Sequence, residues 1–480
     1  MSTSVPSGYS RRVYPLDAQK LTEEQIAVAF AMTSRRPEAF DEIAEQVSRD
    51  KAADFHERWV LGYGHSSVAE HAVLHLAIEN ISRVACDTLE DNRLASYTEK
   101  SSRYQVFPDG YYYVPPEINN NPDLTKLYQQ TCDLLFQEYQ AFIDLCVSHL
   151  KTIHTKRSNE RDAGYELRLR RLATDSCRLL LPSSSLTNVG ITANARVLEH
   201  AISKLLSSEL EEERDLGCEI RDQSQSITPT LIKYANEIPY LKETANHQVD
   251  LTAQWGSEVQ PNYSSSSTIV SLVESDNQAE EKLVTGLLYR QSAQSYSQVK
   301  TRVASMTSEE RRRIIETCTE SLGPHDAPIR EFELIGYTFE FIMDYGAYRE
   351  FKRHRMMSYL PQVLTIDHGY RIPQLFIDAG LEERFNLLME EVASSYIQIS
   401  AVSPKAAQYL VTHAHYRRLV ARCNLRECYH LFKLRTSELA HFSIREPILA
   451  AMRLVVDKDP GFFRHLKLRD YPDWWPYEYE

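Results

Sequence analysis

Apolar residues recur every three or four positions over much of the chain, and this spacing predicts amphipathic helices. The predicted helices cover residues 24–33, 37–50, 123–150, 188–206, 308–321, 335–349, 380–401 and 405–432. One short aromatic run, Tyr111–Pro115, predicts an extended segment instead. The pattern therefore indicates a mostly helical chain with short strands.

The helical pattern weakens between residues 243 and 281, where Ser, Gln, Asn and Glu dominate. Such composition is typical of a connector between domains. We therefore predict a first domain over 1–242, a polar connector over 243–281 and a second domain over 282–480. An ordered, extended crossing segment is the alternative interpretation of the connector.

Composition narrows the class of protein. With 480 residues, of which 42% are hydrophobic and 25% charged, the chain is long enough for two or more globular domains. No apolar run reaches 18 residues, and the first residues have no apolar core of a secretory signal. The eight scattered cysteines include no C-x-x-C pair, which favours reduced thiols and a cytoplasmic location. A net charge of −13 argues against nucleic-acid binding, although a local basic pocket stays open.

Three short patterns occur twice in the same order, which indicates an internal repeat. They are R-x-x-S-Y at Arg93–Tyr97 and Arg355–Tyr359, N-x-R-x3-H at Asn194–His200 and Asn424–His430, and I-R at Ile220–Arg221 and Ile444–Arg445.

Four polar clusters carry candidate chemistry. The turn Gly64-His65-Ser66-Ser67 suits close approach to a phosphate, or simply begins a helix. Ser101 and Arg103 suit the binding of an anion, or form a solvated basic loop.

Lys352–Arg355 is a basic run between apolar and aromatic neighbours, which favours a phosphate pocket over a solvated face. Along 424–435, Arg426 and His430 share one helical line, and Asn424 and Arg435 share another, unless this is an exposed polar face. No metal site is predicted, because His413 and His415 have no accompanying Cys or carboxylate cluster.

Together these clusters resemble the flavin-dependent thymidylate synthase family. The family pattern runs G-H-x-S-x-x-E-H, S-R, R-H-R-x7-S-x-R-Y, an Arg before Leu-Pro, and an N-x-R helix. The first half matches it with residues 64–71, Ser82-Arg83, Arg93 with Ser101, Arg103 and Tyr104, Arg178–Pro182, and Asn194 with Arg196. The resemblance implies an α+β fold of two such units, each with mixed helices and a small antiparallel sheet, forming a pseudo-dimer within one chain.

The two halves depart from the pattern in complementary ways. The first has Asp91-Asn92-Arg93 in place of R-H-R and Leu205 where the second has Arg435. The second keeps R-H-R at 353–355 but has Gln408 where the first has Arg178. A composite site is therefore expected, shared between the repeats, and a homodimer would rebuild a pseudo-tetramer.

The resemblance assigns expected roles. Nucleotide binding is expected of Ser101, Arg103, Arg178 and Arg435, and catalytic contributions of Arg353, Arg435 and Ser101. FAD is expected to be held by His65, Ser67, Arg353, His354, Arg355, Asn424, Arg426 and His430. The implied reaction is reductive methylation of dUMP with FAD, NADPH and methylenetetrahydrofolate, with no membrane partner. The alternatives are a flavoenzyme acting on another pyrimidine nucleotide, or a non-catalytic nucleotide- or flavin-binding protein.

Overall fold

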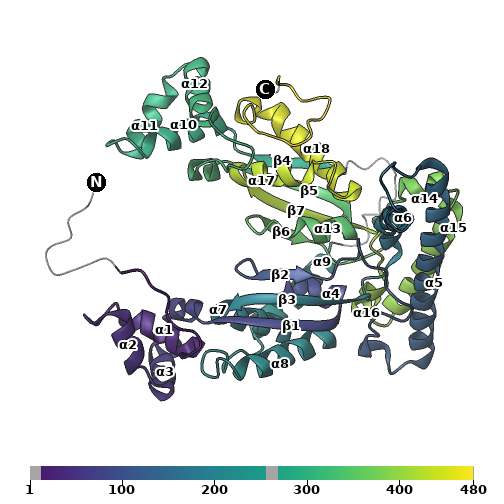
Figure 1. Cartoon of the computed structure of the whole chain (residues 1–480), viewed down its shortest axis with the longest axis horizontal. Helices are drawn as coiled ribbons and strands as arrows, with labels where there is room; N and C mark the ends of the chain where they lie inside the picture. Colours follow the sequence, from purple (N-terminus) through teal and green to yellow (C-terminus); the bar gives the residue numbers. More distant parts are fainter. Residues whose placement is uncertain (1–11, 256–268, 479–480) are drawn as a thin grey trace. The chain divides into compact units, whose positions relative to one another are not determined.

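The computed structural model describes residues 12–255 and 269–478, so the first eleven residues and most of the serine-rich part of the predicted connector lie outside the described residues. The described chain forms two compact units (Figure 1). Unit 1 takes the chain up to Ile81, Ala85–Lys100 and Thr187–Trp255, and unit 2 takes Ser82–Val84, Ser101–Leu186 and the chain from residue 269. Unit 2 thus contains a long segment of the first half.

Unit 1 is built on the three-stranded sheet β1-β3-β2. Its strands are β1 (Val73–Ser82), β2 (Ser96–Glu99) and β3 (Leu186–Asn194), and its helices are α1 (Glu23–Met32), α2 (Phe40–Gln46), α3 (Arg49–Phe55), α4 (Arg83–Leu89, most of which lies here), α7 (Ala195–Leu206), α8 (Glu211–Gln225) and α9 (Pro239–Ala253). A π-helical turn, His56–Gly62, and a 3-10 turn, Ser66–His71, precede β1. The core forms where apolar residues of the sheet meet α4, α7 and α8.

Unit 2 is built on the four-stranded antiparallel sheet β4-β5-β7-β6. Its strands are β4 (Val270–Ser275), β5 (Gly336–Asp344), β6 (Ser358–Pro361) and β7 (Tyr416–Asn424). Its helices are α5 (Pro122–Ile153), α6 (Asp162–Cys177), α10 (Ala279–Tyr289), α11 (Tyr296–Ala304), α12 (Ser308–Thr319), α13 (Tyr345–Phe351), α14 (Gln374–Asp378), α15 (Glu382–Ser400), α16 (Pro404–Ala407), α17 (Leu425–Arg435) and α18 (Phe442–Lys458), with 3-10 turns at Pro116–Ile118, Arg178–Leu180, Arg330–Leu334, Gln408–Leu410 and Pro460–Phe462.

The two sheets repeat the same arrangement. The order β1-β3-β2 in unit 1 matches β5-β7-β6 in unit 2, where β4 adds an edge strand. Tyr97 pairs with Ile191, and Tyr359 occupies the same position against Ala421. Both tyrosine hydroxyls donate to two backbone carbonyls of the turn before their strand, with Tyr359 reaching Phe351 at 2.9 Å. The internal repeat inferred from the R-x-x-S-Y pattern is therefore visible in hydrogen bonds as well as in sequence.

Equivalent segments of the two repeats pair with each other inside unit 2. The backbone N–H of Ser183 donates to Val411 at 2.8 Å, and that of His413 donates to Leu181 at 2.9 Å. Pro182 and Thr412 form an antiparallel bridge at the centre. Nearby, α5 from the first half packs against α15 from the second, and their contact includes a 2.8 Å bond between the Thr131 and Ser395 hydroxyls. Unit 2 is thus assembled from parts of both halves.

Several sequence predictions hold, and others are wrong. Helices over 24–33, 123–150, 308–321 and 380–401 are confirmed, and Asn424 begins the helix that ends at Arg435. The helix predicted over 335–349 is mostly strand β5, because Tyr337, Phe339, Phe341 and Met343 are buried at every second position. The helix predicted over 188–206 likewise begins with strand β3, and the helix predicted over 405–432 is interrupted by strand β7, which separates α16 from α17.

The connector carries regular structure that its composition did not suggest. The predicted connector includes most of α9 and all of β4. The short extended run at Tyr111–Pro115 is represented by one bridge, from Tyr112 to Ser185. Among the described residues, the helices are too short or too polar for any of them to cross a membrane.

His415 stabilises the turn at the junction of the two repeats in a pH-dependent way. Its buried Nδ1 accepts from the backbone N–H of Thr412 at 3.1 Å, and burial lowers the pKa of His415 to about 4. His415 therefore binds a proton more readily in the unfolded chain than in the folded one. For this reason its contribution to the free energy of unfolding is present above pH 6.5 and is lost as the pH falls toward 4. We expect a loss on the order of 3 kcal/mol over that interval.

The test is urea unfolding of the wild type and of His415→Asn, whose amide oxygen can also accept from Thr412. The variant should lose less stability than the wild type between pH 6.5 and 4, while the exposed His325→Asn should follow the wild type. Equal pH slopes for all three proteins would contradict this role of His415.

Candidate functional site

Charged side chains from both halves of the sequence meet in unit 2. Arg178, at the end of α6, donates from Nη2 to Oε1 of Glu350 at 2.9 Å, although 172 residues separate them. Arg435, the last residue of α17, lies 3.6 Å from the other oxygen of Glu350 and donates to its backbone carbonyl at 3.2 Å. We call Arg103, Asp175, Arg178, Glu350 and Arg435 the arginine cluster. Three of its members were expected nucleotide-binding residues.

Carboxylates balance the arginines of this cluster. Arg103 makes a two-pronged ion pair with Asp175, with N–O distances of 2.7 and 3.2 Å. Burial alone would raise the pKa of Glu350, but Arg178, Arg103 and Arg435 outweigh it and hold that pKa below its usual value. Glu350 is therefore an anion at neutral pH. Since charge burial is costly without a partner, these carboxylates are what allow the arginines to be buried.

The remaining nucleotide candidate, Ser101, has a local role in this structure. Its hydroxyl accepts a hydrogen bond from the backbone N–H of Arg103 at 3.2 Å and so shapes the turn that carries Arg103.

His441 lies beside the cluster, where its Nε2 donates to the backbone carbonyl of Asp175 at 3.0 Å. Burial and the charge of Arg178 keep the pKa of His441 well below its usual value, so the ring is neutral.

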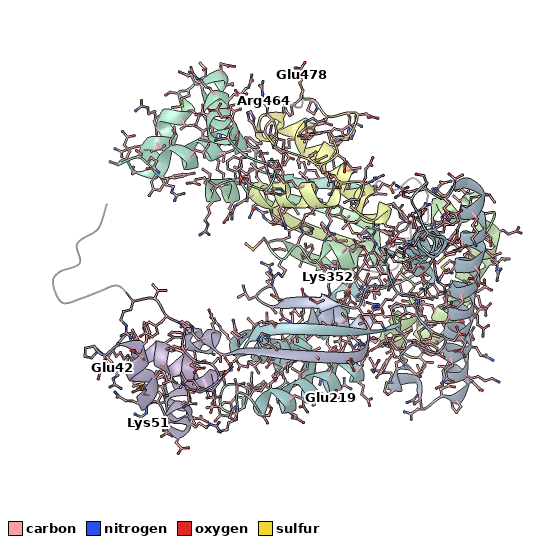
Figure 2. All side chains as sticks on the ribbon, viewed as in Figure 1. Glu42, Lys51, Glu219, Lys352, Arg464 and Glu478 are labelled. Carbon is pink, nitrogen blue, oxygen red and sulfur yellow. The ribbon has the colours of Figure 1, made fainter. Side chains whose placement is uncertain are left out.

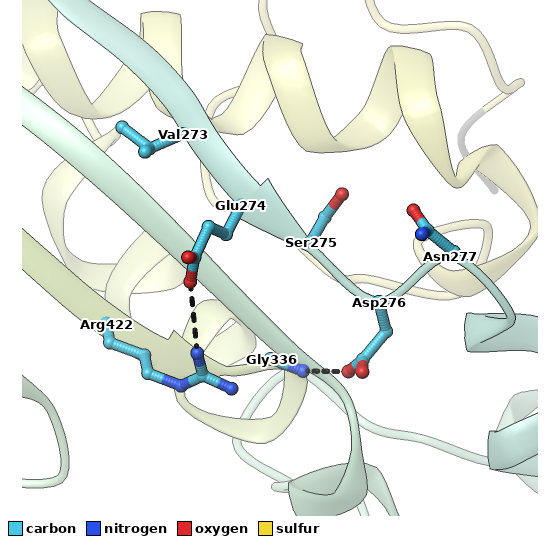
Figure 3. Close-up of a pocket in the computed structure, with 7 residues that line it drawn as sticks. All are labelled: Val273, Glu274, Ser275, Asp276, Asn277, Gly336 and Arg422. Carbon is cyan, nitrogen blue, oxygen red and sulfur yellow. Dashed lines mark hydrogen bonds and ion pairs between the residues drawn. The ribbon is translucent and has the colours of Figure 1, made fainter.

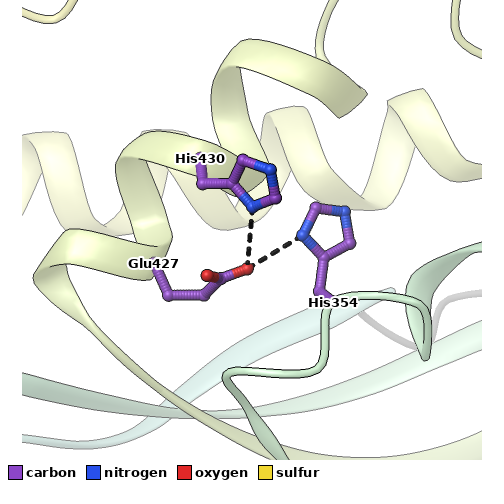
Figure 4. A group of neighbouring side chains, drawn as sticks. All are labelled: His354, Glu427 and His430. Atoms are coloured by element: carbon purple, nitrogen blue, oxygen red, sulfur yellow. Dashed lines mark hydrogen bonds and ion pairs between the residues drawn. The ribbon is translucent and has the colours of Figure 1, made fainter. Parts of the chain in front are cut away.

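A chain of hydrogen bonds leads from the cluster to Glu427. The Nε of Arg435 donates to Nε2 of His354 at 3.0 Å, so the proton of the neutral His354 ring lies on Nδ1. Nδ1 in turn donates to Glu427 at 2.9 Å (Figure 4). Burial lowers the pKa of His354, and the hydrogen bonds from His354 and His430 outweigh burial to lower the pKa of Glu427 to about 2. Glu427 thus fixes the His354 tautomer that receives Arg435.

His354, Glu427 and His430 also form a group whose potential ligand atoms lie within 4.8 Å of one another. A cation on Nδ1 of His354 would force the ring proton onto Nε2, where it would face the N–H of Arg435. The hydrogen-bonded arrangement therefore accounts for this geometry better than a metal does. A second group, Cys86, Glu90 and Glu99, lies in unit 1, where Glu99 accepts from Cys86 and Thr187. The sequence analysis brought neither group together.

The N-x-R helices have the same two contacts in both repeats. Asn194 and Asn424 accept a backbone N–H three residues later and so cap α7 and α17. Arg196 pairs with Glu70, and Arg426 pairs with Glu333 at 2.8 Å. Asn424 and Arg426, expected to hold the cofactor, are therefore also engaged in holding the fold.

The other cofactor candidates divide between the two units. Arg353, Arg355 and His430 are exposed in unit 2. Burial lowers the pKa of Arg435, and the nearby positive charge of Arg353 lowers it too. His65 and Ser67 belong to unit 1. They line a pocket there of about 450 Å³ whose other lining residues are Phe30, Ala31, Ser34, Arg35, Phe55, Trp59, Val68, Glu70 and His71. Arg35 lies over the Trp59 ring at 4.2 Å.

Another pocket, of about 400 Å³, lies at the end of β4 in unit 2 (Figure 3). Its charged side chains are already paired: Glu274 lies 3.5 Å from Arg422, and Asp276 accepts the backbone N–H of Gly336 at 2.9 Å. None of the predicted site residues lines it.

Comparison with known proteins identifies the family. The model of the thymidylate synthase complementing protein family matches the chain twice, over residues 16–230 and 271–461. The chain belongs to this family. The two matches correspond to the two repeats, so the chain carries two copies of the family's unit in tandem.

Individual relatives fall into two groups. A UPF0159 protein of Chlamydia pneumoniae is 30% identical over 97% of this chain and 89% of its own length. A UPF0159 protein of Thermoplasma acidophilum is 26% identical over 88% of this chain and 91% of its own. A flavin-dependent thymidylate synthase of Thermococcus onnurineus is 32% identical over 34% of this chain and 56% of its own.

Sequence reasoning missed Asp175, Glu350, Glu427 and His441. Two of them carried a usable signal: Asp175 precedes Arg178 by one helical turn, and Glu427 stands at the third position of a helix capped by Asn424. Glu350 and His441 carried none, because their partners are far away in the sequence.

The hydrogen bond from His354 makes Glu427 a test of this network. Leu in place of Glu427 would leave the buried Nδ1–H of His354 without an acceptor, which costs about 1–3 kcal/mol. Gln in place of Glu427 still offers an amide oxygen and should cost less. Urea unfolding of both variants should show this order, and a Gln variant as unstable as the Leu variant would argue that the hydrogen bond is unimportant.

Proposed function

We propose that the protein is a flavin-dependent thymidylate synthase-like methyltransferase that reductively methylates dUMP, using FAD, NADPH and methylenetetrahydrofolate. The observation that carries this proposal is the convergence of Arg103 and Arg178 from the first repeat with Arg435 from the second around Glu350. Guanidinium groups suit a phosphate or the oxygens of a pyrimidine, since they donate paired hydrogen bonds. Family membership and the relatives named flavin-dependent thymidylate synthase support the same reaction class.

The residues expected to hold FAD fit it in part. Arg353, Arg355 and His430 are exposed and offer cationic or hydrogen-bonding groups to a phosphate-bearing cofactor. His354 is engaged at both ring nitrogens, so its contribution is to orient Arg435. Asn424 and Arg426 position α17. Bound FAD would supply the hydride chemistry, while the chain binds and orients the nucleotide.

In this proposal Arg103 and Arg178 bind the nucleotide, with Ser101 shaping the loop of Arg103. Arg435 and Arg353 stabilise negative charge that develops on the pyrimidine ring. His65 and Ser67 belong to the flavin site of a facing unit. Each repeat is a synthase-fold unit, the two form a pseudo-dimer, and two chains form a pseudo-tetramer in the cytoplasm. Light scattering should then give twice the chain mass of 55.4 kDa.

A flavoenzyme acting on another pyrimidine nucleotide is the second candidate. The observation that favours it is the loss of the R-H-R triplet from the first repeat, which has Asp91-Asn92-Arg93 instead. Asn92 stands where the second repeat has His354, and its buried amide donates to Leu89 at 2.8 Å, while the neighbouring Asp91 pairs with Lys204. In this second candidate, the sites built on the first repeat's triplet no longer take part in the family reaction.

Two experiments separate these candidates. We expect the purified protein to carry a yellow chromophore, and its gene to restore growth of a thymidine auxotroph. A yellow protein that fails to complement, and that forms no dTMP from dUMP in vitro, would favour the second candidate. A colourless protein that cannot be reconstituted with FAD would exclude both.

The shared site predicts that residues of both repeats are needed. Arg178→Ala and Arg353→Ala should each lower dTMP formation by at least about a hundredfold, because each removes a charged contact of about 3 kcal/mol. Arg464→Ala is the matched control, since Arg464, labelled in Figure 2, is half-exposed. It pairs with Glu316 at 2.8 Å, away from the expected site residues. Wild-type turnover in either of the first two variants would contradict a site built from both repeats.

A further inference from the structure

Glu350 is a buried carboxylate held by the arginines expected to bind an anion. It is 8% exposed, lies on the last turn of α13, and contacts Arg178 and Arg435 through its two oxygens. The charge of Arg103 also helps to keep it ionised. An internal anion thus lies among the arginines that are expected to bind the nucleotide.

The balance of charge in the arginine cluster is close to neutral. Its three arginines face two carboxylates, Asp175 and Glu350, and the neighbouring His441 is neutral. One positive charge therefore remains in excess, whereas a phosphate monoester carries between one and two negative charges at neutral pH. A phosphate entering the cluster would meet the charge of Glu350 at a partly buried position, where repulsion between like charges is stronger than in water.

Arg178 retains hydrogen-bonding capacity beyond its bond to Glu350. Its side chain is 5% exposed, and its Nε has no hydrogen-bond partner among the residues that the structure describes. A buried donor of this kind carries an energetic penalty until it is satisfied. A ligand oxygen placed beside this Nε would remove that penalty.

We propose that Glu350 is a specificity-determining residue: it acts as an internal anion that competes with the phosphate of a nucleotide for Arg178 and Arg435. The inference rests on the proposed function in taking the ligand to be a nucleoside monophosphate. Glu350 lowers the contribution of the phosphate to binding, so that recognition depends more on the nucleoside. The same carboxylate keeps the buried arginines paired when no ligand is bound.

The test is calorimetric titration of the full chain as purified, with dUMP, deoxyuridine and inorganic phosphate as probes. Glu350→Gln removes the charge but keeps the shape and one acceptor oxygen. We expect this variant to bind dUMP and inorganic phosphate about tenfold more tightly, as removal of one like-charge repulsion allows, with deoxyuridine little changed. The ratio of the deoxyuridine and dUMP dissociation constants should therefore rise about tenfold.

Glu274→Gln is the matched control, because Glu274 makes an ion pair with Arg422 at the pocket beside β4 and removal of its charge should leave all three affinities unchanged. Thermal unfolding checks that the Gln variant at 350 is folded, and Glu350→Asp, which retains the charge, should bind like the wild type. Equal or weaker phosphate and dUMP binding by a folded Glu350→Gln protein would overturn the proposal, since Glu350 would then serve only to position the arginines. Absence of phosphate and dUMP binding in both proteins would overturn it too.

These outcomes are separable from the proposed reaction. If no dTMP forms but Glu350→Gln binds phosphate more tightly, the result supports the role of Glu350 and contradicts thymidylate synthesis. If dTMP forms and the variant gains no affinity for phosphate or dUMP, the result supports thymidylate synthesis and contradicts the role of Glu350.

Discussion

The antiparallel pairing of residues 179–184 with residues 409–414 is the contact on which the arrangement of unit 2 depends. Arg178 directly precedes the first of these segments, so the pairing fixes where its side chain begins. The second segment leads into β7, and the carbonyls of His413 and His415 receive the backbone N–H groups of Gly346 and Tyr345. The start of α13, and with it Glu350, is therefore fixed against the same segment as Arg178. A few backbone hydrogen bonds thus bring a first-repeat cation and a second-repeat anion to within 2.9 Å.

Once the arginines are buried in this way, their charge has to be compensated inside the chain. A guanidinium removed from water costs several kcal/mol unless a well-placed acceptor receives it. Asp175 and Glu350 supply these acceptors, and His354 supplies a neutral one to Arg435. The cluster can fold without a ligand for this reason. The same compensation leaves a ligand phosphate less net positive charge to bind than three arginines would suggest.

The sequence predicted the tandem repeat, the family and the long helices, because these depend on local patterns. α5, α12 and α15 each bury one face, and their apolar residues return at helical spacing. The sequence of β5 also fits a helix, because its aromatic run contains apolar residues three and four apart, and only burial reveals that alternate side chains face the core. In the cluster, the arginines were predictable from motifs. Glu350 was not, since its partner Arg178 lies 172 residues away and long-range pairing leaves no local pattern.

Comparison of the two repeats separates residues that fold the chain from those that serve its site. Both repeats keep the capping Asn, the Arg–Glu pair and the tyrosine that closes the turn, and in both these residues make the same contacts. The shared fold is sufficient to explain such residues. Arg178, His354 and Arg435 differ, because the other repeat has Gln408, Asn92 and Leu205 in their places. A fold that both repeats adopt cannot require a residue that only one of them has. Arg178, His354 and Arg435 therefore need another explanation. Arg178 and Arg435 belong to the arginine cluster, and His354 accepts a hydrogen bond from Arg435.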